Sequence, residues 1–327
     1  MSEAANVLVV GCGAVGTMCA YALHKSKAAT VTGVFRSNFE EVQRLGLCIR
    51  SVDHGTVLDW KPHHARRLVE RNISDAARHG PFDYVLVAMK SLPDIYSIPD
   101  LIALAVTPGR TSIVLVQNGI DIEWPFVDAF PENVVLSGVT MIGCELNGRE
   151  VLHNDPDKLH LAPFPSPGLH RRRQEDACST FAALYALGGV ACEIHEDIVR
   201  RRWMKLVWNA SFNPVCAITG LDSGAVQAAG YIDTLVRPVM DEVVAIAEAA
   251  GYGLQPGIQD EMISFTPEAI GLKPSMQVDA MMDRPMEVEV ILGNPLRIAQ
   301  ELKVEAPVLT ILCNLLRARQ WKYKQRT

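Results

Sequence analysis

Near its N-terminus the chain reads Asn6-Val-Leu-Val-Val-Gly11-Cys-Gly13-Ala14-Val15-Gly16. The first five residues are a short apolar run rich in β-branched side chains, which predicts a buried strand. The residues from Thr17 to His24 read as a helix. Strand, glycine turn and helix in this order are the context that a Gly-x-Gly-x-x-Gly dinucleotide-binding fingerprint requires. The stretch therefore predicts an α/β fold that binds a dinucleotide.

The residues of this fingerprint have separate physical roles. Gly11 permits the tight turn, Gly13 lets the backbone approach a pyrophosphate, and Gly16 lets the helix pack closely on the strand. Ala14 and Val15 lie at the helix N-terminus, where free N–H groups and the positive end of the helix dipole favour phosphate. We therefore predict that these five residues bind the cofactor. The alternative is a glycine-rich turn with a structural role alone.

The end of the second predicted strand, Thr30 to Val34, bears on the choice of cofactor. Folds that bind NAD place an acidic residue near this point to hold the ribose 2′-hydroxyl. This chain has Arg36, with Ser37 and Asn38 beside it. A guanidinium donates paired hydrogen bonds that suit a 2′-phosphate. Arg36 therefore favours NADP(H), and an exposed arginine with no such role is the alternative.

Two further polar residues follow predicted buried strands. Lys90 comes after the strand from Phe82 to Ala88, and Asn118 comes after the strand from Ser112 to Val116. Ligands of open α/β sheets lie just beyond the carboxyl ends of the strands. We therefore expect Lys90 and Asn118 to face the cofactor or the substrate.

The remaining first half of the chain continues the α/β pattern. It contains a predicted hairpin, further strands, a helix and a short closing strand: Leu47 to Ser51 with Thr56 to Trp60, Val134 to Val139, Met141 to Leu146, Glu150 to Leu152, Leu159 to Ala162, Arg171 to Leu187, and a strand ending at Glu193. We expect a Rossmann-type domain over residues 1–194.

The second half has no strand pattern, and its most informative stretch runs from Arg202 to Pro214. The stretch has no glycine and meets proline only at its end, which predicts a helix that stops there. Lys205, Asn209 and Asn213 follow at steps of four, and each such step turns about 40° around a helix. The other positions are largely apolar, which predicts burial. Buried polar side chains need partners, supplied either by the protein or by a ligand.

The rest of the second half also reads as helical. Short helical turns are expected over Val215 to Gln227, and longer helices over Tyr231 to Ala250, Met276 to Asp283, Glu287 to Val304 and Val308 to Arg319. We therefore predict an all-α domain over residues 195–327. Two polar clusters, at Ser275 to Asp279 and Arg284 to Glu289, are typical of ordinary helix starts, with Ser275 as an N-cap.

Composition narrows the function classes. The 327 residues are 49% hydrophobic with a net charge of −6, which suggests two domains and no nucleic-acid surface. The eight cysteines lack metal-like spacing, so we expect no metal site. No apolar run reaches about 18 residues, so no membrane span is expected. The start, with acidic Glu3 just before a strand, does not resemble a signal peptide, which favours a cytoplasmic location.

Together these motifs resemble the ketopantoate reductase (2-dehydropantoate 2-reductase) family over nearly the whole chain. The matching elements, in family order, are Gly11-x-Gly-Ala-Val-Gly16, Lys90, Gln117-Asn118-Gly119, Arg202-Trp203-x-Lys205-Leu206-x-x-Asn209-x-x-x-Asn213-Pro214, Ser275-Met276-x-x-Asp279 and Arg284-x-x-Glu287. The resemblance implies a Rossmann domain joined to an all-α domain, with the site in the cleft. It also implies NADPH-dependent reduction of the 2-keto acid ketopantoate to pantoate.

The resemblance assigns roles to individual residues. It implies that Lys205 is the general acid at the carbonyl oxygen and that Glu287 binds the substrate hydroxyl and helps tune Lys205. Asn209 and Asn213 would orient the substrate, and Ser275 would hold its carboxylate. Lys90 and Asn118 would contact the cofactor near its reactive end.

Some positions depart from the family pattern. Family members often have Thr-Glu-Ile-Asp where this chain has Met286-Glu287-Val288-Glu289, and Leu-Thr-Ala-Leu where it has Val215-Cys216-Ala217-Ile218. These changes leave open another 2-keto acid, as in secondary metabolism, rather than pantothenate synthesis.

Two readings from other classes are also open. One alternative is a non-catalytic NADP(H) sensor, and the other is an opine-type or 3-hydroxyacid dehydrogenase. The joint presence of Lys205 and Glu287 disfavours the sensor, and the lack of a histidine on the Lys205 helix disfavours the dehydrogenases. A homodimer formed through the helical domain is a hypothesis only.

Overall fold

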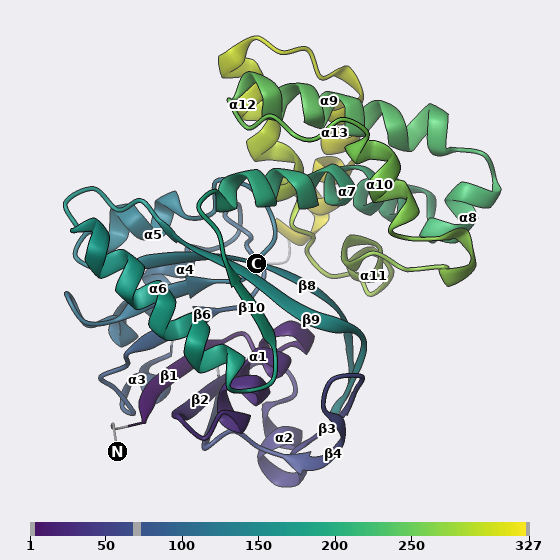
Figure 1. Cartoon of the computed structure of the whole chain (residues 1–327). Coiled ribbons are helices and arrows are strands. Elements are labelled where there is room, and N and C mark those ends of the chain that lie inside the picture. The colour runs from purple at the N-terminus through teal and green to yellow at the C-terminus, as the bar shows by residue number, and fades with distance from the viewer. Residues whose placement is uncertain (1–3, 68–72, 325–327) are drawn as a thin grey trace. The chain divides into compact units, whose positions relative to one another are not determined.

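The computed structural model describes residues 4–67 and 73–324, so Glu3 lies outside the described residues (Figure 1). The chain forms two compact units. The first unit comprises residues 1–90, 97–117 and 122–198, and the second comprises residues 91–96, 118–121 and 199–327. Two short segments of the N-terminal half thus belong to the second unit, and each unit is described by itself below.

A ten-stranded sheet forms the frame of the first unit, in the order β4-β3-β9-β8-β7-β6-β1-β2-β5, with β10 paired to β9. The strands are β1 (Ala5–Val10), β2 (Ala29–Phe35), β3 (Leu47–Ser51), β4 (Gly55–Trp60), β5 (His64–Arg67), β6 (Tyr84–Val87), β7 (Ser112–Leu115), β8 (Val135–Asn147), β9 (Glu150–Phe164) and β10 (Ala191–Ile194).

The strands from β5 through β2, β1, β6 and β7 to β8 pair in parallel. Taken alone, these six strands run in the order 3-2-1-4-5-6 of a Rossmann sheet, whose direction of winding reverses between β1 and β6. This arrangement confirms the predicted fold class for the N-terminal part of the chain.

One long antiparallel hairpin extends the sheet beyond the Rossmann order. β8 and β9 pair from Val135 with Phe164 to Asn147 with Glu150. The sequence predicted four shorter strands here, with breaks at Thr140, at Asn147-Gly148 and around Pro156. The break at Asn147-Gly148 is confirmed, and the other two were wrong. The register shifts on either side of Gly143, so a local irregularity opposite this stretch lets β9 continue through a proline, which lacks a ladder N–H.

The helices of the first unit are mostly short. They are α1 (Ala14–Lys25), α2 (Phe39–Leu45), α3 (Ser74–Ala77), α4 (Ile98–Ile102) with the 3₁₀ turn η1 (Ala103–Ala105), α5 (Trp124–Ala129) and α6 (Arg171–Ala186). α1 and α6 pack against each other and against the sheet (Figure 1). The core between them includes Met18, Leu23, Phe181 and Tyr185, all fully buried.

The second unit is helical, and its described residues contain no strand. Its elements are α7 (Ile198–Thr219), α8 (Ser223–Ala228), the π-helical turn η2 (Ile232–Val236), α9 (Arg237–Ala249), α10 (Ile258–Ser264), η3 (Glu268–Ile270), α11 (Ser275–Met281), the π-helical turn η4 (Glu289–Gly293), α12 (Asn294–Leu302) and α13 (Pro307–Lys324). Within the described chain, none of these helices is both long enough and apolar enough to cross a membrane.

The sequence placed several helix ends wrongly. α7 does not stop at Pro214 but continues to Thr219, and the residues after the proline, Val215 to Ala217, are buried. A proline inside a helix loses one hydrogen bond and clashes locally, so tertiary burial holds this helix together. α11 ends at Met281 because Asp283 has a φ of +52°, outside the helical region. Its N-cap is Pro274, not Ser275.

Candidate active site

Three loops meet at the carboxyl edge of the parallel strands in the first unit. A Cβ added to Gly11, after β1, would lie 2.5 Å from the backbone nitrogen of Met89, which follows β6. Gln117, after β7, donates a 2.6 Å hydrogen bond from Nε2 to the carbonyl oxygen of Met89. The loops after β1 and β6 therefore touch where the winding reverses, which is where open α/β sheets bind ligands.

The three fingerprint glycines differ in what surrounds them. Gly11 has a φ of +97°, which favours glycine, and Gly16 approaches the carbonyl oxygen of Gly11 so closely that an added Cβ would lie 2.2 Å from it. Gly13 has an ordinary φ of −78°, and an added Cβ would meet no atom within 4 Å. Close packing thus explains why Gly11 and Gly16 have no side chain. No such packing surrounds Gly13, which leaves space beside the N-terminus of α1.

Other predicted cofactor residues lie near the same edge. Ala14 and Val15 form the first turn of α1, whose N-cap Gly13 makes no side-chain capping bond. Arg36 is exposed directly after β2, and half-buried Lys90 follows Met89 after β6. Burial raises the pKa of the Cys12 thiol in the glycine loop to about 12, so this thiol stays neutral at physiological pH.

Helix α7 carries the polar stripe of the second unit. Lys205 is partly buried, Asn209 is 6% exposed and Asn213 is 1% exposed. Oδ1 of Asn213 accepts a 3.4 Å hydrogen bond from the amide of Met276. This bond ties α7 to the first turn of α11, and it places exposed Ser275, the residue before Met276, beside the stripe. A protein group thus satisfies part of the hydrogen-bonding capacity of Asn213, in agreement with the alternative that the protein supplies the partners of this stripe.

Glu287 lies just before η4 and is 8% exposed. Its Oε1 accepts a 2.8 Å hydrogen bond from the backbone amide of Ser91. The amide of the preceding residue, Met286, donates to Oε1 of Gln320 at 2.8 Å, and Nε2 of Gln320 donates to Asp94 at 3.2 Å. The segment Ser91–Tyr96 therefore anchors both the carboxylate and the backbone beside it.

The segment Asn118–Asp121 joins α7 to η4. Buried Arg202, three residues before Lys205, donates from Nη1 to the carbonyl oxygen of Gly119 at 3.2 Å. The amide of Ile120 donates to the carbonyl oxygen of Val290 at 3.1 Å, and Asn294 donates from Nδ2 to the carbonyl oxygen of Ile120 at 2.7 Å. A Cβ on Gly119 would lie 2.7 Å from Val290. Asn118 is thus held next to the helix of Lys205 and the turn that follows Glu287.

These bonds bring most of the predicted substrate residues onto one framework of the second unit. The stripe of α7, the Asn118 segment, the Glu287 turn and the start of α11 are linked by hydrogen bonds. Sequence reasoning assigned no role to Arg202, Ser91 or Gln320, which build this framework. The only local signal was the position of Arg202 at the start of the motif that resembles the family. Ser91 and Gln320 act through partners far along the chain.

Most of the residues that depart from the family pattern are buried in the structure. Met286, Val215 and Cys216 are buried, and burial raises the pKa of the Cys216 thiol to about 12. Glu289 forms a bidentate ion pair with Arg317, with N–O distances of 2.8 and 2.6 Å. Gly293 lies under this carboxylate, where an added Cβ would be 2.4 Å from Oε2 of Glu289. Glu289 therefore has a structural partner of its own.

Family models match both halves of the chain. The ketopantoate reductase PanE/ApbA model matches residues 7–166, and the model of the C-terminal part of the same family matches residues 197–320. The chain belongs to the ketopantoate reductase family. Ketopantoate reductases of this family are NADP-dependent oxidoreductases that act on CH–OH groups, and the family membership supports reduction of a 2-keto acid with a nicotinamide dinucleotide.

Individual relatives are similar over the full family length. An uncharacterised protein of Saccharomyces cerevisiae is 33% identical, with 98% of this chain and 95% of that protein covered. A 2-dehydropantoate 2-reductase of a Nostoc species is 27% identical, with 94% and 93% covered. The crystal structure of 2-dehydropantoate 2-reductase from Methylococcus capsulatus is 33% identical, with a TM-score of 0.80 and 97% of each chain covered.

Proposed function

We propose that this protein reduces a branched 2-keto acid to the 2-hydroxy acid with NADPH, and that 2-dehydropantoate (ketopantoate) is the substrate. The observation that carries the proposal is the anchored framework of the second unit. It presents a lysine, a carboxylate and carboxamides from separate segments that hydrogen bonds hold together. A protein that only sensed NADP(H) would have no use for Lys205 together with Glu287.

Lys205 is the proposed proton donor. Reduction of a ketone places negative charge on the carbonyl oxygen, and an ammonium group that is partly withdrawn from water stabilises that charge and then supplies the proton. Asn209 and Asn213, one and two turns further along α7, orient the substrate by hydrogen bonds. Ser275, exposed at the start of α11, donates to the substrate carboxylate.

Glu287 is the proposed partner of the substrate hydroxyl. Its Oε1 accepts from the Ser91 amide, and a carboxylate has further acceptor positions for a hydroxyl donor. A site that hydrogen-bonds a hydroxyl discriminates strongly against an analogue that lacks it, because the buried group is left without a partner. Ketopantoate should therefore react much faster than 2-ketoisovalerate, a shorter branched 2-keto acid that lacks the hydroxymethyl group carrying this hydroxyl.

The first unit fits a dinucleotide. A Cβ added to Gly13 would meet no atom within 4 Å, and the amides of Ala14 and Val15 at the N-terminus of α1 favour an anion, which supports this position for the pyrophosphate. Exposed Arg36, directly after β2, suits a 2′-phosphate. Lys90 and Asn118 are the proposed contacts near the reactive end. The bound dinucleotide supplies the hydride, and the protein positions the acceptor and delivers the proton.

The direct test follows NADPH absorbance with purified protein and a panel of 2-keto acids. The panel contains ketopantoate, 2-ketoisovalerate, pyruvate and an aromatic 2-keto acid. We expect ketopantoate to give the highest kcat/KM. Reduction of another member with ketopantoate inert would keep the chemistry and reject the named substrate, together with a place in pantothenate synthesis.

A second candidate is the same chemistry on another 2-keto acid, favoured by the buried departures Met286, Val215 and Cys216. If no member of the panel is reduced while NADPH still binds, the reductase proposal fails and the NADP(H) sensor takes its place.

A further inference from the structure

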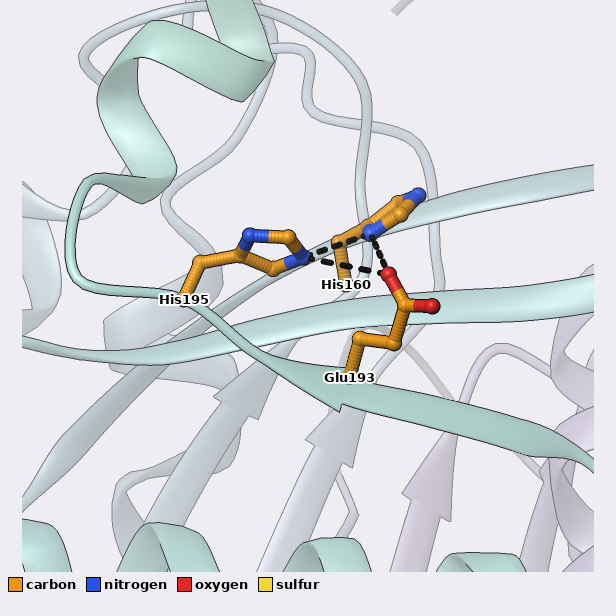
Figure 2. Close-up of side chains that lie close together, drawn as sticks. All are labelled: His160, Glu193 and His195. Carbon is orange, nitrogen blue, oxygen red and sulfur yellow. Dashed lines mark hydrogen bonds and ion pairs between the residues drawn. The ribbon is translucent and has the colours of Figure 1, made fainter.

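Sheet geometry brings two histidines and a glutamate together in the first unit. Glu193 on β10 pairs in parallel register with His160 on β9. His195 follows Glu193 by two residues, which places it on the same face because side chains alternate along an extended chain. Figure 2 shows the two rings and the carboxylate pointing toward one another.

The facing atoms are close enough to share one ion. Nδ1 of His160 lies 2.7 Å from Nε2 of His195. Oε2 of Glu193 lies 3.4 Å from the first nitrogen and 3.6 Å from the second. A triangle with these sides has a circumradius of about 1.9 Å, so a point slightly above its plane is about 2.0–2.1 Å from all three atoms, the usual length of zinc–nitrogen and zinc–oxygen bonds.

We propose that His160, Glu193 and His195 bind a divalent transition-metal ion of the Zn²⁺ class. Two imidazole nitrogens and one carboxylate oxygen are ligands that such ions accept, and water completes the tetrahedron. Hard ions such as Mg²⁺ prefer oxygen ligands and fit this set poorly.

The surroundings support this use of the carboxylate. Nζ of Lys158, two residues before His160 on β9, forms a 2.7 Å ion pair with Oε1 of Glu193. That contact occupies the oxygen that faces away from the rings and leaves Oε2 directed at both nitrogens. The side chain of His160 is 8% exposed, that of His195 is 19% exposed and that of Glu193 is 48% exposed, so the site opens to solvent on the side of the glutamate.

The ion would join three parts of the chain. His160 belongs to β9, Glu193 to β10, and His195 to the connection that leads into α7 at Ile198. In the described structure β10 pairs with β9 alone, so a shared metal ion would strengthen an edge strand. None of these residues has a role in the proposed reduction. The sequence predicted no metal site because it has no short Cys/His spacing typical of one, and these two histidines are 35 residues apart.

The test measures Zn²⁺ binding to the full chain, after treatment with a chelator, by calorimetry and by competition with a chromophoric chelator. We expect one equivalent per chain. His160→Ala, His195→Ala and Glu193→Gln should each weaken binding by at least about tenfold, since even outer-shell partners of metal ligands matter by about 10–100-fold. His170→Ala removes an exposed histidine at the start of α6 and is the matched control, with unchanged affinity expected.

Two further measurements separate a lost site from a lost fold. Circular dichroism should be the same for all four variants and the parent, and Zn²⁺ should raise the melting temperature of the parent and of His170→Ala only. Co²⁺ should give the visible absorption of a tetrahedral ion in the same two proteins. The proposal is overturned if the parent binds no Zn²⁺, or if the His160 and His195 variants bind Zn²⁺ as tightly as the parent.

Discussion

The backbone amide of Ser91 donates a 2.8 Å hydrogen bond to Oε1 of Glu287, 196 residues further along the chain. The bond comes from the main chain, so it fixes the carboxylate whatever side chain stands at position 91. A main-chain contact thus holds the Glu287 carboxylate of the candidate site in place.

Substitution of Glu287 should separate anchoring from chemistry. Glu287→Gln keeps a side-chain oxygen for the Ser91 amide but removes the negative charge, so the melting temperature should change little while kcat/KM for ketopantoate falls. Glu287→Ala should also lower the stability by about 1–3 kcal/mol, because the amide loses its partner. The comparison needs thermal melts and steady-state kinetics on both variants. Parental kcat/KM in Glu287→Gln would remove this residue from the substrate site.

Lys205 should control turnover without controlling cofactor binding. Lys205→Ala should lower kcat by roughly 10²–10⁴, the usual range for a general acid, with the Kd for NADPH nearly unchanged by fluorescence titration. Lys205→Arg should rescue poorly, because a guanidinium does not readily give up a proton. Parental turnover in the alanine variant would mean that the proton donor lies elsewhere.

Gly13 and Gly16 offer a matched pair of substitutions. Gly13→Ala adds a methyl group that meets no protein atom within 4 Å, so the melting temperature should stay near that of the parent while NADPH binding weakens by about tenfold or more, the effect of losing roughly one hydrogen bond to a charged group. Gly16→Ala forces a carbon within 2.2 Å of the carbonyl oxygen of Gly11, so it should destabilise the fold by about 1–3 kcal/mol. Normal NADPH affinity in Gly13→Ala would argue against a pyrophosphate at this point.

Arg36 should set the preference between cofactors. The parent should have a higher kcat/KM with NADPH than with NADH. Arg36→Asp should weaken the use of NADPH by on the order of 1.5–3 kcal/mol, the worth of a hydrogen bond to a charged group, and should leave NADH less affected. The kinetic constants of both proteins with both cofactors provide the test. A parent that uses the two cofactors equally would contradict the assignment.

Four histidines of the first unit should make the protein less stable in mild acid. Burial lowers the pKa of His24 and His54, and also of His64 and His79, with smaller contributions from nearby cations and histidines. Above the ordinary histidine pKa of about 6.5 these rings are neutral in both states. As the pH falls below that value the unfolded chain binds protons first, so stability is lost until the folded pKa values are passed.

This prediction calls for melting temperatures at about pH 7.5 and about pH 5.5, on either side of the ordinary pKa of about 6.5. The parent should melt lower in acid. His24→Gln removes one of these groups, whose ring stacks on His63 at 4.4 Å between centroids, and should reduce the difference between the two temperatures. An unchanged difference would show that His24 contributes nothing to the acid sensitivity.

The sequence predicted the start of the Rossmann sheet because its signals are local. Strand, turn and helix follow one another within residues 6 to 24, and the structure has β1, the turn at Gly11 and α1 in that order. The extension of α7 past Pro214 could not be predicted in this way, because distant buried contacts outweigh a local helix-breaking residue. The continuity of β9 through Pro156 likewise depends on its partner strand β8.

The assembly of the candidate site was predictable only in part. Spacing placed Lys205, Asn209 and Asn213 on one stripe, and the structure puts all three on α7. The anchoring of Glu287 by Ser91, and of Gly119 by Arg202, spans 196 and 83 residues, and no local pattern encodes such contacts. Likewise the grouping of His160 with Glu193 and His195 appears only when β10 is paired with β9.

Ser91–Tyr96 and Asn118–Asp121 come from the N-terminal half of the chain but belong to the second unit, which has a consequence for folding on the ribosome. Translation adds about 5–20 residues per second, so the Ser91 amide waits roughly 10–40 s for Glu287 to be made. Throughout that interval Ser91–Tyr96 and Asn118–Asp121 lack the helices that hold them. A nascent chain can thus fold its Rossmann sheet before the Glu287 carboxylate meets the Ser91 amide. The framework around Lys205 forms among the last events of biosynthesis.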